Sequence, residues 1–465
     1  MDKASPAVHS TALAVRSAGD LVFGCAPKPV GCGFELIIGA GQVYPEVNFT
    51  LPTMTISEAS WSQVIQQYKE MVEGILRRAV ALHVPGIVLE FEHLPPMTER
   101  PEWGAEITAL LSGQLEKAHA THGLRSALRV TPVDLRDQTR PPLLRTGEAW
   151  ERVKRSFEVC ADSGAHILSI ESVGGKEVHD EALLYGDVRG LVFALGVLAA
   201  HDMAWLWDHI AGICRARWRV IPGGDSACGF ANTAMQLANQ GMLPEVLAAV
   251  DRAMTAPRSL VAFEHGAIGP SKDCAYEGPV IKAITGAPIS MEGKSASCAH
   301  FSPLGNIAAA MCDLWSNESV QNVRLLSGSA PEAFTELLAY DCRLMNLALE
   351  RDGAGTLRDW LAESDRWLSP QAVMLSPDAT YEIARAILGE FSDYQRTVAA
   401  GKTAVSLLEG GFASGRLKLS KSEEQWLYRI EEQLGSLPAD ERDLFAEMTT
   451  TYGHLFKPAS YGLPA

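Results

Sequence analysis

The chain has 465 residues, of which 47% are hydrophobic and 21% are charged, as in an ordinary globular protein. Its formal net charge of −16 argues against a nucleic-acid partner, because such proteins need clustered lysines and arginines to displace phosphate counterions. Length suggests two or three domains, and an α/β barrel with additions fits the same length.

Targeting and membrane signals are weak in this sequence. The first twenty residues carry Asp2, Lys3, Arg16 and Asp20 and no long apolar core, so they do not predict a signal peptide. The longest hydrophobic patch, residues 191–200, is too short to span a bilayer. Nine scattered cysteines without a Cys-x-x-Cys pair indicate reduced thiols rather than a disulfide framework. We therefore expect a cytoplasmic protein without a membrane segment.

Short apolar runs and segments of helical spacing alternate along the first 330 residues. Apolar positions recur three or four residues apart over residues 57–83, which predicts a helix that ends at Pro85-Gly86. Further predicted helices cover residues 104–122, 147–163, 186–214, 231–255, 279–285 and 303–314. The predicted strands cover residues 34–38, 87–91, 125–130, 165–170, 218–221, 260–263, 288–291 and 323–326.

This alternation predicts βαβ units and a parallel sheet. About eight strands are expected, the number that closes a TIM (β/α)8 barrel. A doubly wound open sheet stays an alternative, although neither residues 31–33 nor residues 39–41 complete a Gly-x-Gly-x-x-Gly turn. Beyond residue 327 the strand signals end and helical segments follow. We predict a barrel domain over residues 1–330 and a helical C-terminal extension over residues 331–465.

Three potential metal ligands follow predicted strands. Glu171 comes directly after residues 165–170, Cys228 lies in the glycine-rich stretch 223–230, and Cys274 lies in a loop after residue 263. Because active sites of α/β barrels lie at the carboxyl ends of the strands, these side chains are expected to converge. Two thiolates and a carboxylate suit zinc, and three protein ligands leave a fourth position for substrate. The spacing alone is also compatible with a purely structural role, in which the two cysteines are small buried residues and Glu171 caps a turn.

Three motifs carry a resemblance to a known family. Residues 170–177 are Ile-Glu-Ser-Val-Gly-Gly-Lys-Glu, and residues 223–232 are Gly-Gly-Asp-Ser-Ala-Cys-Gly-Phe-Ala-Asn. Residues 269–277 are Gly-Pro-Ser-Lys-Asp-Cys-Ala-Tyr-Glu. In this order, the motifs resemble the zinc-containing, methanol-activating subunit of methanol:corrinoid methyltransferases, and the resemblance covers most of the chain. It implies a TIM barrel with a helical addition and a zinc ion held by Glu171, Cys228 and Cys274.

The resemblance also implies a reaction and a partner. The methyl group of methanol would move to cob(I)alamin carried by a separate corrinoid protein. The nearest string to the corrinoid-binding motif Asp-x-His-x-x-Gly, residues 208–212, has the wrong spacing, so the corrinoid must come from the partner and His209 is expected to be an ordinary helix residue. We expect a homodimer within a hetero-oligomer, in which the C-terminal helices either dimerise or cover the barrel mouth.

The chemistry calls for a proton donor. Breaking the C–O bond of methanol expels hydroxide, a poor leaving group, and zinc eases its departure as it lowers the pKa of bound water from about 15.7 to about 7. Two thiolates and one carboxylate leave the site with a formal charge of −1, which weakens this effect. Asp225 is the first candidate donor, followed by Glu177, Glu90 and Glu92.

Two other functions stay open at this point. The same zinc chemistry could act on a methoxylated aromatic compound or another methyl donor. Alternatively, the chain could be a non-catalytic scaffold that binds the corrinoid protein.

Overall fold

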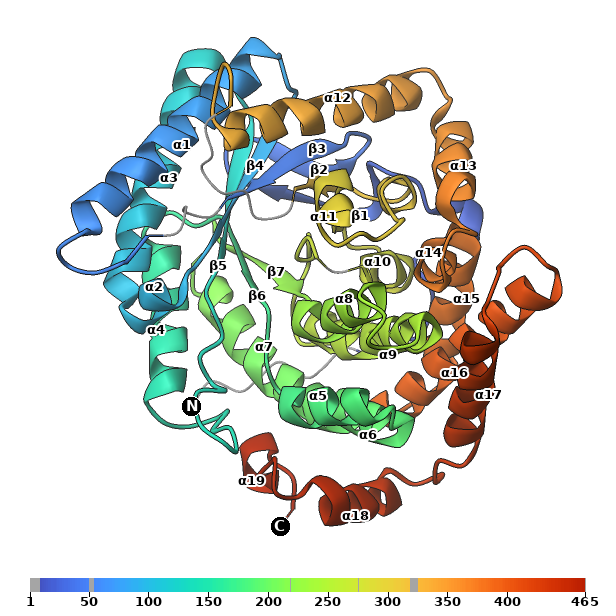
Figure 1. Ribbon diagram of the computed structural model, residues 1–465. Coiled ribbons are helices and arrows are strands. Elements are labelled where there is room, and N and C mark those ends of the chain that lie inside the picture. The colour runs from blue at the N-terminus through green and yellow to red at the C-terminus, as the bar shows by residue number, and fades with distance from the viewer. Residues whose placement is uncertain (1–8, 50–53, 218, 275, 318–324, 465) are drawn as a thin grey trace.

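The fold is built around a curved sheet of seven parallel strands (Figure 1). The computed structural model describes residues 9–49, 54–217, 219–274, 276–317 and 325–464. The strand order is β7-β6-β5-β4-β3-β9-β8. The strands are β3 Tyr44–Asn48, β4 Ile87–Glu92, β5 Ser126–Thr131, β6 Ile167–Ile170, β7 Ile221–Asp225, β8 Ser290–Glu292 and β9 Leu314–Ser316.

An irregular segment between β7 and β8 closes this sheet. The backbone N–H of Ile268 donates to the carbonyl of Pro222 on β7 at 2.9 Å, and that of Ser271 donates to the carbonyl of Pro288 just before β8 at 3.3 Å. Residues 268–271 therefore occupy the place of an eighth strand. The predicted TIM-type α/β barrel is confirmed, with one of its eight positions filled by irregular backbone.

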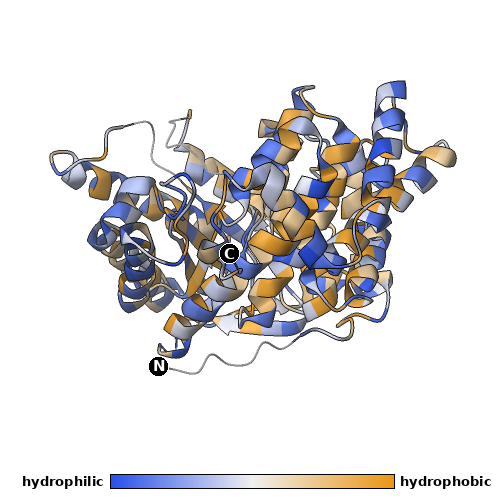
Figure 2. Cartoon of the chain, turned by 90° about the horizontal axis from the view of Figure 1, so that it is seen from below, coloured by the Kyte–Doolittle hydropathy of each residue, from blue (hydrophilic) through white to orange (hydrophobic). Residues whose placement is uncertain are grey.

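Helices surround the barrel. Those before residue 330 are α1 Trp61–Ala81, α2 Pro95–Glu99, α3 Pro101–His122, α4 Glu148–Asp162, α5 Lys176–Tyr185, α6 Val188–Phe193, α7 Ala200–Arg215, α8 Thr233–Asn239, α9 Glu245–Glu264, α10 Gly278–Thr285 and α11 Lys294–Ala299. Figure 2 shows that hydrophobic and hydrophilic residues alternate along individual helices, as amphipathic helices on a core require.

The chain after residue 330 is helical in its described part. Its helices are α12 Ala330–Glu350, α13 Ala354–Asp365, α14 Pro370–Leu375, α15 Pro377–Leu388, α16 Asp393–Ala413, α17 Lys421–Gly435, α18 Glu441–Tyr452 and α19 Pro458–Tyr461. Helix α12 packs on α1 and β3, in the place of the helix that follows the last barrel strand, whereas α14, α16 and α17 pack on α9. The division at residue 330 stays a prediction.

Several predicted segments differ from the structure. In its described part the predicted strand 218–221 overlaps β7 at Ile221 alone, and the predicted helix 231–255 is divided between α8 and α9. Residues 34–38 belong mainly to β2, outside the barrel. The first barrel strand is β3, which contains Pro45 and is covered by none of the predicted strands. Residues 260–263 lie inside α9, because a short apolar run does not distinguish a buried strand from a buried helix. Residues 303–314 contain only a 3-10 turn at Ile307–Ala309 before β9 begins. Of the predicted strand 323–326, the first two residues lie outside the described part of the chain and the last two are not in a strand.

A two-stranded hairpin covers the amino-terminal end of the barrel. It comprises β1 Cys25–Cys32 and β2 Leu36–Ala40. Leu36 and Ile38 are buried against residues at the starts of the barrel strands, namely Tyr44, Val88, Ala127, Ile167 and Leu314. The hairpin fills this end, so a substrate has to enter at the opposite end.

Gly33 lets the hairpin approach β5, and its substitution is expected to be destabilising. Gly33 has φ +56°, and an added Cβ would lie 2.2 Å from the carbonyl oxygen of Ser126. We expect Gly33→Ala to lower the free energy of unfolding by roughly 1–3 kcal/mol in urea titrations. Gly31→Ala is the matched control, because a Cβ at Gly31 meets nothing within 4 Å. Equal midpoints for the two variants would contradict this role of Gly33.

One helical stretch, Val188–Arg215, is long and apolar enough to cross a membrane. It includes α6, α7 and the π-helical turn Ala194–Ala199 between them. The protein buries 83% of its most apolar window, so this stretch packs as a core helix.

Candidate metal centre

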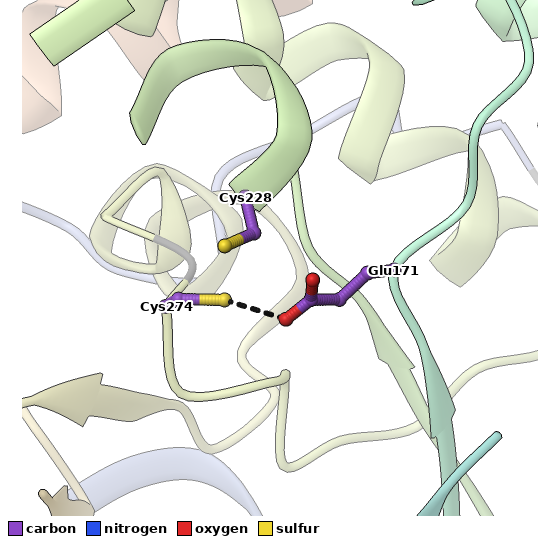
Figure 3. Close-up of side chains that lie close together, drawn as sticks. All are labelled: Glu171, Cys228 and Cys274. Atoms are coloured by element: carbon purple, nitrogen blue, oxygen red, sulfur yellow. Dashed lines mark hydrogen bonds between the residues drawn. The ribbon is translucent and has the colours of Figure 1, made fainter. Parts of the chain in front are cut away.

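The three predicted ligands meet at the carboxyl end of the barrel (Figure 3). Glu171 follows β6 directly, Cys228 opens the π-helical turn Cys228–Asn232 after β7, and Cys274 follows the irregular segment 268–271. The Cys274 thiol donates to Glu171 Oε1, with Sγ and oxygen 3.1 Å apart. One potential ligand atom from each of the three residues lies within 4.8 Å of the other two. The structure thus brings together three side chains from a span of about a hundred residues.

Two glycines of β7 allow the close packing behind this cluster. An added Cβ at Gly223 would lie 2.6 Å from Ser169 Oγ on β6. Gly224 has φ +149°, and a Cβ there would lie 3.3 Å from the Cα of Ser271. The glycine-rich stretch that precedes Cys228 therefore lets β7 pack tightly against both β6 and the segment that carries Cys274.

The cluster is closed on one side and open on the other. Cys274 is 2% exposed, whereas Cys228 is half-buried and the Glu171 side chain is 30% exposed. A metal held by these three residues would keep an accessible position, as catalytic zinc sites do.

Lys272 lies among four carboxylates beside the cluster. Its Nζ is 2.6 Å from Asp273, 2.8 Å from Glu90, 3.5 Å from Glu92 and 3.6 Å from Glu171 Oε1. Burial alone would lower the pKa of Lys272, but Asp273 and Glu90 raise it well above its ordinary value, so the ammonium stays charged. Burial and the neighbouring Asp273 raise the pKa of Glu90 well above its ordinary value, so the four carboxylates do not all ionise beside a single ammonium, and a bound cation would favour their ionised forms.

The pKa values of all three ligand groups are raised. Burial raises the pKa of Glu171 to about 7, with a further contribution from Glu92. The hydrogen bond with Cys274 lowers the pKa of Cys228, but burial and the Glu171 charge raise it to about 12 overall. Burial also raises the pKa of Cys274 well above its ordinary value. Without a cation, these three groups do not all ionise together. A bound divalent metal would stabilise the carboxylate and both thiolates, and so would lower all three pKa values. The donor set therefore fits zinc.

Two of the predicted proton donors are engaged elsewhere. Asp225 is buried, where its Oδ1 accepts from Arg258 at 3.1 Å and its Oδ2 accepts from the Trp207 indole N–H at 3.2 Å. Glu177 accepts from Arg140 at 3.0 Å, and burial raises its pKa to about 7. Both oxygens of Asp225 already accept hydrogen bonds, from Arg258 and Trp207, so this carboxyl is poorly placed to deliver a proton to the cluster.

The other two predicted donors belong to the cluster. Glu90 is fully buried and accepts from the Thr131 hydroxyl at 2.8 Å, while the Glu92 side chain is 29% exposed. Both share Lys272 with Glu171. Lys272 and Asp273 are not among the predicted site residues, although both lie inside the motif around Cys274. The signal that could have identified them is that two charged residues directly precede the proposed ligand Cys274 in the sequence.

A barrel that brings two thiols and a carboxylate together at its open end has the donor set of enzymes that bind a single metal ion. Residues 7–462 match the family model for the methanol-cobalamin methyltransferase B subunit, and the chain belongs to this family. The resemblance seen in the three motifs is thereby confirmed, and so is the assignment as a methyltransferase.

Individual relatives agree with this family. The chain is 39% identical over 460 residues to the methanol–corrinoid protein co-methyltransferase of Methanosarcina barkeri (strain Fusaro / DSM 804), covering 97% of this chain and 98% of that protein. It is similar, with a TM-score of 0.94, to a chain in the crystal structure of the methanol:cobalamin methyltransferase complex MtaBC from Methanosarcina barkeri. That match covers 98% of this chain and 99% of the other, at 39% identity.

Proposed function

We propose that this protein transfers the methyl group of methanol to the corrinoid of a separate corrinoid protein, with zinc held by Glu171, Cys228 and Cys274. The observation that carries the proposal is the convergence of these three side chains at the open end of the barrel, in a chain of this family. The names of the relatives, a co-methyltransferase and a chain of the MtaBC complex, support the donor and the acceptor.

The residues of the cluster have separable tasks. A bound Zn²⁺ would supply Lewis acidity toward the oxygen of methanol. The methyl carbon leaves that oxygen for the cobalt of cob(I)alamin, and the departing hydroxide takes up a proton to become water. We assign this proton to Glu92, because its side chain is partly exposed and its contacts with Asn48 and Lys272 both use Oε2, so that Oε1 can carry a proton. Asp225 is the weaker candidate, since Arg258 and Trp207 occupy its two oxygens.

The acceptor has one direction of approach. The hairpin of β1 and β2 fills the amino-terminal end of the barrel, where Phe34 and Ser126 exchange backbone hydrogen bonds at 2.7 and 3.1 Å. A corrinoid carried by a partner protein therefore has to approach from the carboxyl end. His209 lies in α7, where its Nδ1 contacts the Trp205 carbonyl at 2.7 Å, which supports an ordinary helical role for it.

Removing the metal is expected to abolish methyl transfer. Lewis-acid stabilisation supplies several kcal/mol, so a chelator-treated protein should be slower by at least about a thousandfold. The readout is the spectral conversion of cob(I)alamin to methylcobalamin after methanol is added. One equivalent of zinc should restore the rate, and full activity in protein shown to be free of metal would contradict the proposal.

The same assay separates the alternatives. Methoxylated aromatic compounds in place of methanol test the other class of donor. Binding of the corrinoid protein without any methylation of its cofactor would indicate the scaffold role.

The proposal also covers the compartment and the assembly of the protein. All nine cysteines are free thiols, as expected in a reducing compartment, which supports a cytoplasmic enzyme. We expect the protein to form a homodimer that associates with the corrinoid protein. Sedimentation of the isolated chain, and of its mixture with that partner, tests both contacts.

A further inference from the structure

The sulfur of Cys228 has an amide neighbour. Asn232 Nδ2 donates to Cys228 Sγ at 3.7 Å, a distance within the range of hydrogen bonds to sulfur. The two residues are the first and last of the π-helical turn Cys228–Asn232, and Asn232 is only 2% exposed. The turn thus places a buried N–H donor against a proposed metal ligand.

Arg252 fixes the orientation of this amide. Its Nη2 donates to Asn232 Oδ1 at 3.2 Å. A guanidinium has donors and no acceptor, so the oxygen of the amide has to face Arg252. The amide nitrogen of Asn232 therefore faces the Cys228 sulfur. A flipped amide would lose the hydrogen bond with Arg252.

Arg252 in turn connects the centre to the C-terminal helices. It lies on α9, is 2% exposed, and its Nε donates to Gln371 Oε1 on α14 at 2.6 Å. Its guanidinium also lies over the Tyr276 ring, 4.8 Å from the centroid, two residues after Cys274. One arginine therefore contacts both cysteine-bearing segments and is itself held from outside the barrel.

We propose that Gln371, Arg252 and Asn232 form a positioning chain that sets how strongly the Cys228 thiolate donates electrons to the metal. This inference rests on the proposed function, because it requires Cys228 to be a ligand. An N–H donor at a thiolate withdraws charge from the sulfur, so the metal stays more electron-poor and polarises the methanol oxygen more strongly. Partners of this kind around metal ligands change metal affinity or activity by about 10- to 100-fold when they are removed.

The variant Asn232→Asp tests the N–H donor at Cys228 most directly. An aspartate of the same shape keeps the contact with Arg252 but replaces the N–H donor at Cys228 by a carboxylate oxygen. In Co²⁺-substituted protein, the thiolate-to-cobalt absorption should move to longer wavelength, because the sulfur lone pair is no longer stabilised. With zinc, kcat for methyl transfer should fall by about 10- to 100-fold, with a much smaller change in the KM for methanol.

A second variant acts from further away. Gln371→Met removes the acceptor for Arg252 without touching the cysteine-bearing segments, and should shift the cobalt band in the same direction by a smaller amount. Gln236→Ala is the control, since Gln236 lies on α8 and its side chain contacts His300. This variant should leave the cobalt spectrum unchanged. Circular dichroism confirms that each variant is folded.

The outcomes distinguish the two proposals. If wild-type protein with Co²⁺ lacks a thiolate band, or if Cys228→Ala keeps it unchanged, the proposed metal site itself is wrong. If the wild-type band is present but both Asn232→Asp and Gln371→Met leave its wavelength and kcat unchanged, the positioning chain is refuted. Should Asn232→Asp not fold, the Gln371→Met spectrum decides alone.

Discussion

Cys274→Ala is expected to abolish zinc binding and to slow methyl transfer by at least about a thousandfold. Cys274 is the most buried of the three proposed ligands, and its sulfur lies 3.1 Å from both Glu171 Oε1 and Ser226 Oγ. Without this thiolate, a metal would keep one cysteine and one carboxylate, too few to hold it against chelators. Metal analysis of the purified variant measures the first effect, and the methylcobalamin assay measures the second.

Cys298→Ala is the matched control for this experiment. Cys298 is an exposed free cysteine on α11, away from the three ligands in the sequence. Its removal should leave the zinc content and the rate at wild-type values. A Cys274→Ala protein that retains one zinc per chain would remove Cys274 from the ligand set.

Arg129→Met is expected to lower the free energy of unfolding by about 3–5 kcal/mol, because it leaves a buried carboxylate without its partner. Arg129 and Glu46 are fully buried inside the barrel, and Nε of Arg129 lies 2.7 Å from Glu46 Oε1. The same guanidinium donates to Ser169 Oγ at 2.8 Å and to the Pro270 carbonyl at 3.0 Å. The midpoint of urea unfolding measures the loss.

The double variant Arg129→Met, Glu46→Met tests this cause. Removal of both charges leaves no unpaired ion, so much of the lost stability should return. Neither variant keeps the hydrogen bond from Arg129 to the Pro270 carbonyl, which holds the segment that leads to Cys274. Zinc affinity should therefore be lower than in the wild type in both the single and the double variant. Equal stability of the single and double variants would show that the buried charge is not the cause.

The sequence was informative wherever the signal is local. Helical spacing placed α1, α3 and α4 close to their observed bounds, and Gly123 ends α3 in the left-handed conformation expected of a C-terminal glycine. Apolar runs likewise located β4, β5 and β6, since strands buried on both faces are continuously hydrophobic.

Prediction failed where the environment overrides local preference. Proline disfavours a central strand because it lacks an N–H, yet β3 contains Pro45 and pairs with both β4 and β9. The run 260–263 looked like a strand but ends a helix that is buried almost all around. The eighth barrel position is filled by residues 268–271, which contain Gly269 and Pro270, residues that carry no strand signal.

By itself, the sequence determined the alternation of strands and helices and, through three short motifs, the family and the proposed ligands Glu171, Cys228 and Cys274. Only the tertiary structure decided which other groups meet them. Lys272 gathers carboxylates from three separate strands or loops, Asp225 turns instead to Arg258, and Gln371 reaches Arg252 from the C-terminal helices. The physical reason is that these contacts depend on strand register and barrel closure, which bring distant segments within hydrogen-bonding distance and leave no periodic trace in the chain.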